Sequence, residues 1–139
     1  MSLIRQWHSS GLSLRLIPNK ALRLRDDYRQ SLHQLLAPDL FLTEIANSLA
    51  SAEKFGRIQP NQAAQFLLQI INNAPSLQDA EPIIVRALEV CLSTRHSVYD
   101  CLYVALAERE ACEFVTADDK LVKNLQPTFP CIISLSSLP

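Results

Sequence analysis

The sequence predicts an α/β fold, a three-layer α/β/α sandwich in which helices cover both faces of a central parallel sheet. Two observations lead to this prediction. Short apolar runs of strand-like composition alternate along the chain with longer amphipathic segments, and prolines, more often than glycines, separate them. Strands that alternate with helical segments favour parallel β-α-β units. The 139 residues are enough for one hydrophobic core, so we expect a single domain over residues 1–139.

Six segments have the periodicity of helices, with apolar residues recurring at spacings of three and four. Pro60 and Pro82 each fit the first turn of the helix that follows, where a missing N–H costs nothing. Gly56 fits the stop of the helix before it. The expected helices span residues 20–35, 42–58, 61–74, 82–96, 97–111 and 118–125.

The strand candidates are short apolar runs between these helices, at residues 35–41, 75–78, 112–117 and 131–138. The segment LSLRLI, residues 12–17, is a further candidate. The preceding MSLIRQWHSSG has no clear period, so residues 1–18 form an atypical N-terminal segment of the predicted domain.

Composition excludes several functional classes. The 13 Lys and Arg residues nearly balance the 14 Asp and Glu residues, so no overall basic field marks a nucleic-acid binder. No apolar run approaches the roughly 20 residues of a membrane span, and the N-terminus lacks the features of a signal peptide. The four cysteines have no CxxC spacing, which favours buried free thiols in a reducing cytoplasm over zinc ligands or disulfides. The three histidines show no metal-binding spacing either.

Each acidic residue near a helix start has a structural explanation when it is taken singly. Ser97-x-x-Asp100 and Thr116-x-x-Asp119 both match the capping box, in which a hydroxyl and an acid satisfy free backbone N–H groups. Glu44, near the start of its helix, gains from the helix dipole. On this interpretation the acids are caps and have no part in chemistry.

Taken together, the same acids suggest a metal site. In a parallel sheet, the carboxyl ends of strands and the N-termini of helices meet at one edge, where such folds place their ligands. Glu44 and Asp118 each follow an expected strand, and Asp100 joins them if its helix begins at the same end. Clustered carboxylates favour a hard divalent cation, and Mg²⁺ suits phosphodiester chemistry. Asn47, one turn after Glu44, is either a polar neighbour of that site or a surface amide.

Three segments carry a resemblance to a known family: LLAPDLFLTEIANSL, SVYDCLYVALAE and FVTADDKLV. In this order they resemble the signature segments of PIN-domain proteins, and in particular the VapC-type toxin ribonucleases of bacterial toxin–antitoxin pairs. The resemblance runs from about Lys20 to Leu138. It implies a PIN-like sandwich, a cytoplasmic endoribonuclease that uses Mg²⁺ or Mn²⁺, a cognate antitoxin and a homodimer. Carried over by position, the metal ligands would be Glu44, Asp100 and Asp118, with Asp119 auxiliary, and Asn47 and Thr116 would hydrogen-bond around the site.

The N-terminus departs from the family pattern, which begins with a strand that ends in an aspartate. This sequence has no acid before Asp26, and Asp26 and Asp27 face outward on the expected first helix. From the family's usual spacing we expect the strand end near Ile4. The missing acid leaves two functions open: a ribonuclease with weakened, Mn²⁺-favouring activity, or a degenerate PIN module that binds an antitoxin or RNA without efficient cleavage. A plain helical interaction domain would require the three signatures to be a coincidence.

Overall fold

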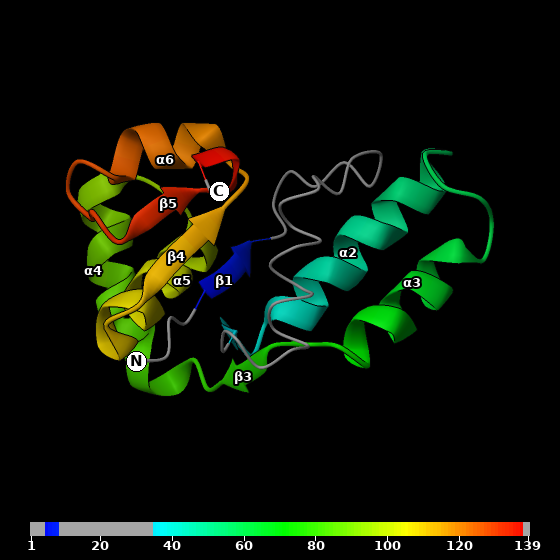
Figure 1. The fold of residues 1–139 in the computed structure, drawn as a ribbon, viewed down its shortest axis with the longest axis horizontal. Helices are drawn as coiled ribbons and strands as arrows, with labels where there is room; N and C mark the ends of the chain where they lie inside the picture. Colours follow the sequence, from blue (N-terminus) through cyan, green and yellow to red (C-terminus); the bar gives the residue numbers. More distant parts are fainter. Residues whose placement is uncertain (1–4, 9–34, 138–139) are drawn as a thin grey trace.

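The computed structural model describes residues 5–8 and 35–137 (Figure 1). Several sequence-based expectations lie outside these residues. They are the candidate strand over residues 12–17, Asp26 and Asp27, and all but the last residue of the helix expected over residues 20–35.

Three strands form a parallel sheet: β1 (Arg5–His8), β4 (Glu113–Thr116) and β5 (Ile132–Ser134), in the order β1-β4-β5. The register pairs His8 with Thr116, and Thr116 with Ser134. All three carboxyl ends therefore lie at one edge. The four residues of β1, RQWH, have no apolar alternation that would mark a strand, and β1 is formed by backbone pairing with β4.

A second, two-stranded parallel sheet consists of β2 (Leu36–Pro38) and β3 (Ser76–Gln78). β2 also lies beside β1. The predicted class of helices with parallel strands is confirmed, but the described strands pair as two sheets where the sequence predicted one. The chain enters helix at Phe41, directly after a turn, so β2 is shorter than the apolar run over residues 35–41.

The helices follow the predicted order, with adjusted ends. The helix expected over residues 61–74 begins only at Gln62, because Asn61 has a left-handed backbone (φ 69°). Pro60 therefore precedes this helix and does not lie in its first turn. Gly56, also at φ 69°, lies just past the end of its helix, as predicted. The elements are α2 (Phe41–Lys54), α3 (Gln62–Ile71), η1 (Glu81–Ile83), α4 (Ile84–Thr94), α5 (Val98–Glu110), α6 (Asp119–Leu125) and η2 (Leu135–Ser137).

Helix α5 is the centre of the core. Its residues from Cys101 to Ala107 are all buried, so apolar side chains surround it on every side. The Tyr103 ring stacks on Phe114 of β4, with centroids 5.5 Å apart and planes 17° apart. Ser97 caps the helix N-terminus, and Ala111 (φ 50°) ends it and reverses the chain into β4. The position of α5 against β4 is therefore fixed along its length.

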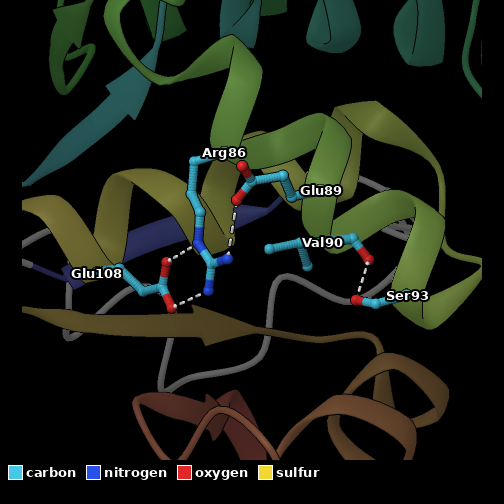
Figure 2. A network of polar contacts seen from close by, with 5 residues as sticks. All are labelled: Arg86, Glu89, Val90, Ser93 and Glu108. Atoms are coloured by element: carbon cyan, nitrogen blue, oxygen red, sulfur yellow. Dashed lines mark hydrogen bonds and ion pairs between the residues drawn. The ribbon is translucent and has the colours of Figure 1, made fainter.

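Helix α4 is joined to α5 by a polar cluster on the surface (Figure 2). Arg86 Nε and Nη2 donate to the two carboxylate oxygens of Glu108 at 2.9 and 3.0 Å, and Nη1 donates to Glu89 Oε2 at 3.1 Å. The hydrogen bond to Glu108 is the main cause that raises the pKa of Arg86. The two parallel hydrogen bonds to Glu108 add geometric specificity to the contact between α4 and α5.

The four cysteines are free, as predicted. Cys101 and Cys112 are buried, and burial raises the pKa of each thiol to about 11. Both thiols are therefore protonated and unreactive at neutral pH. Over residues 5–8 and 35–137, no helix combines the length and apolar character needed to cross a membrane.

Candidate functional site

Glu44 lies in the first turn of α2, which follows the carboxyl end of β2 after only a short turn. No side-chain hydrogen bond caps the N-terminus of α2, and the negative charge of Glu44 in the first turn interacts favourably with the helix dipole. Its side chain is half-buried, and its Oε1 accepts a hydrogen bond from the Tyr103 hydroxyl at 3.2 Å. This bond joins α2 to α5.

Asp100 lies in the first turn of α5. Its backbone N–H donates to Ser97 Oγ at 3.2 Å, which is the hydroxyl half of the predicted capping box. Tyr103 is three positions after Asp100, so both lie on one face of the helix. Burial, then Glu44 and finally Asp100 raise the pKa of Tyr103 well above its usual range. Both carboxylates thus act on one buried phenol.

Asp118 has a defined role in the local backbone. Thr116, the buried last residue of β4, accepts a hydrogen bond from the Asp118 N–H at 3.1 Å. Asp118 Oδ1 in turn accepts from the Leu121 N–H at 3.1 Å and caps α6. The predicted capping box from Thr116 to Asp119 is therefore wrong, because Thr116 is still in the strand and the cap falls on Asp118. Asp119 is exposed, and its Oδ1 accepts from Ser134 Oγ at 3.1 Å.

The connections explain why Asp100 and Asp118 share one edge of the sheet. Only Ala111 and Cys112 separate α5 from β4, so the helix runs back against the strand and begins near the strand's carboxyl edge. Asp100, in the first turn of α5, thus lies towards the edge from which Asp118 emerges. Tyr103 joins Glu44 to this end of α5.

Within the described ranges, no three His, Cys, Asp or Glu side chains form a group that could hold one metal ion. Glu44 accepts a hydrogen bond from the Tyr103 phenol, Asp100 lies one turn before Tyr103 on α5, and Oδ1 of Asp118 accepts from the Leu121 N–H at the start of α6. Asn47 is exposed one turn further along α2. The convergence of all three acids on one ion stays a prediction.

The donor chemistry of the Glu44 and Asp100 pair fits a hard divalent cation. Carboxylate oxygens are its preferred ligands, and Mg²⁺ typically takes only one or two of them, together with waters and substrate phosphates. Glu44 and Asp100 supply two carboxylates, and Asp118 is a third acid at the same edge of the sheet. These residues are therefore of the chemical type that binds Mg²⁺.

Two residues near this site were not assigned a role from the sequence. His8 ends β1 opposite Thr116, so the strand end expected near Ile4 was placed too early in the chain. No periodicity in residues 1–11 marks it. Tyr103 could have been found, because its spacing of three from Asp100 puts both on one helix face.

Comparison with known proteins decides the family. A family model of the PIN domain matches residues 17–124. This chain belongs to the PIN-domain family. PIN domains are generally nucleases and typically use divalent metal ions. The crystal structure of PAE2754 from Pyrobaculum aerophilum has a similar fold, with a TM-score of 0.71 over 99% of this chain and 94% of that one, at 20% identity. No curated protein matches the chain significantly.

The matched region of the PIN domain contains all the predicted site residues, from Glu44 to Asp119. It begins after β1, so His8 lies outside it. The family and fold predicted from the three segments are confirmed.

Proposed function

We propose that this PIN domain is a metal-dependent endoribonuclease that hydrolyses RNA phosphodiester bonds, and that it is the toxin of a type II toxin–antitoxin pair. The observation that supports this most is the hydrogen bond from the buried Tyr103 hydroxyl to Glu44, which links a carboxylate of α2 to the helix whose first turn carries Asp100. Two carboxylates from segments far apart in the sequence, linked through one helix, suit the binding of a cation, and capping alone does not account for the contact between Glu44 and Tyr103.

In this proposal, Glu44 and Asp100 hold Mg²⁺ or Mn²⁺, with Asp118 as the third acid and Asp119 as an auxiliary one. A bound ion supplies a water of lowered pKa and neutralises charge on the phosphate. Thr116 holds the Asp118 backbone through its hydroxyl. The exposed Asn47 amide is available to RNA on the same side of α2 as Glu44.

The test is cleavage of single-stranded RNA in the presence of Mn²⁺. We expect weak cleavage by the native chain and none by Asp100→Asn. Glu110→Gln, the same change of carboxylate to amide at the far end of α5, should cleave like the native chain. Cleavage that survives Asp100→Asn would assign the activity to a contaminant or to another site.

The second candidate function is a PIN module that binds an antitoxin or RNA without efficient cleavage. The observation that favours it is His8 at the carboxyl end of β1, where the family pattern described above has an aspartate. This candidate is supported if the purified chain binds single-stranded RNA yet neither it nor a variant with a restored acid cuts it.

We propose a homodimer formed through α4. Four aliphatic side chains lie exposed along this helix, with Leu92 74% and Val85 68% exposed, and Tyr99 at the start of α5 is 60% exposed. The exposed Glu81 and Arg95 lie near opposite ends of α4, so an antiparallel copy would bring opposite charges together. A stable interface buries about 800 Å² of accessible surface on each partner. We place the apolar face of α4 at the centre of this interface.

The dimer proposal predicts that Leu92→Glu gives a monomer by light scattering at micromolar concentration. Leu68→Glu, on the exposed face of α3, is the matched control and should remain dimeric. A native chain with the mass of a monomer contradicts the proposal.

The cognate antitoxin and a cytoplasmic location complete the proposed function. The antitoxin rests on the resemblance to VapC-type toxins, and the location on four free thiols, which persist in reducing compartments.

A further inference from the structure

Tyr103 makes a contact that its role in the core does not require. Its side chain is fully buried, its ring stacks on Phe114, and its hydroxyl donates to Glu44 Oε1 at 3.2 Å. A buried phenol requires a hydrogen-bond partner, and any uncharged acceptor within reach would serve. The partner is instead a carboxylate from α2, one of the two acids in the proposed metal site.

The Tyr103 ring is held more tightly by its surroundings than the Glu44 carboxylate is. Tyr103 is fixed by the stacked ring and by the buried residues around it on α5. The Glu44 side chain has three rotatable bonds and is only half-buried, so the contacts that it makes decide its rotamer. The hydrogen bond from the fixed Tyr103 hydroxyl favours one orientation of its carboxylate.

Resting on the proposed function, we propose that Tyr103 is a positioning residue. Its hydroxyl holds the Glu44 carboxylate beside Asp100, in the orientation that binds the divalent cation. Tyr103 is therefore not a catalytic residue, and it acts on the cation only through Glu44.

The direct test is Mn²⁺ affinity, measured by isothermal titration calorimetry. Tyr103→Phe keeps the ring and its stacking and removes only the hydroxyl. We expect Mn²⁺ binding to weaken by about 10-fold or more, the size of effect seen when a partner of a metal ligand is lost. Tyr99→Phe is the matched control, since it makes the same change on the same helix next to Asp100 but at an exposed side chain. It should bind Mn²⁺ like the native chain.

A double-mutant cycle separates positioning from a general effect on the core. In a Glu44→Gln background, Tyr103→Phe should cause no further loss of Mn²⁺ affinity, because its effect passes through the carboxylate. Native affinity in Tyr103→Phe, or a full additional loss in the Glu44→Gln background, overturns the inference.

A measurement on the native protein covers the case in which Tyr103→Phe does not fold. Substoichiometric Mn²⁺, which is paramagnetic, should broaden the NMR signal of the Tyr103 ring carbon that carries the hydroxyl. An unbroadened signal, or a native chain that binds no Mn²⁺, overturns the inference. Mn²⁺ binding with the predicted Tyr103 effects but without RNA cleavage contradicts the proposed function alone and leaves the role of Tyr103 intact.

Discussion

Asp118 combines a structural contact with a proposed chemical role, and the two can be separated by substitution. Its Oδ1 caps α6 through the Leu121 N–H, and its backbone is held by Thr116. Asparagine is as good an N-cap as aspartate, whereas alanine loses about 0.5–2 kcal/mol of stability. The charge matters only to a bound cation.

We therefore predict different outcomes for two substitutions of Asp118. Asp118→Asn should unfold in urea at nearly the native midpoint but lose RNA cleavage, and Asp118→Ala should lose cleavage and about 1 kcal/mol of stability. Urea denaturation and the cleavage assay on the same preparations check this. If Asp118→Asn retains native activity, Asp118 is a cap and nothing more.

His8 is the position at which to restore the missing acid. It ends β1, in register with Thr116, at the edge where Asp118 emerges. An added carboxylate at this strand end would give the cation a further ligand, and effects of single groups around a metal run to 10–100-fold. We predict that His8→Asp raises Mn²⁺-dependent cleavage by at least about 10-fold and that His8→Asn does not. Equal activities for the two variants would show that this strand end does not belong to the site.

The residues of the site differ in how far the sequence could place them. The parallel-edge rule placed Glu44 and Asp118 at one edge because it needs only element order, and it included Asp100 on the condition that its helix begins at the same end. The sequence pattern assigns the N-cap of α6 to Thr116, whereas the structure assigns it to Asp118. The choice depends on the residue at which β4 ends, and periodicity does not define strand ends to the residue. The Tyr103 bond to Glu44 depends on how α2 packs on α5, which the sequence of neither helix specifies.

At the scale of elements, helices were predicted more closely than strands. Helix α5 was found nearly to the residue, because Ser97 marks its start and the apolar run continues through three turns. β1 ends at His8, four residues beyond the strand end expected near Ile4, and β5 is shorter than its apolar run, ending where η2 begins. Strands of three or four residues depend on backbone pairing with distant partners, and their own composition carries little of that information.

The contact between α4 and α5 leads to a prediction about the Arg86 cluster. The Arg86 and Glu108 side chains are 49% and 33% exposed, so solvent screens their attraction. A double-mutant cycle with Arg86→Gln and Glu108→Gln, followed by urea unfolding, should give a coupling of about 0.2–1 kcal/mol that shrinks in about 1 M salt. A coupling several times larger and insensitive to salt would mean that this pair is a principal support of the α4–α5 contact.

At the scale of the whole molecule, the fold depends on the pattern of many residues, whereas the detailed function depends on a few. The chain shares its fold with a protein only 20% identical to it, because apolar patterning and element order are enough to specify the architecture. The proposed metal site depends on a few carboxylates and on their partners. The family model covers residues 17–124, so it leaves out the strand whose end would complete the site.

The central claim is that Glu44 and Asp100 together bind the cation that cleaves RNA. Anomalous diffraction from crystals soaked in Mn²⁺ tests it most directly, because the signal locates the ion without reference to activity. We predict one strong anomalous peak about 2.0–2.6 Å from carboxylate oxygens of both Glu44 and Asp100. The peak should disappear in crystals of Asp100→Asn. A peak bound elsewhere, or none in a fully soaked native crystal, would contradict it.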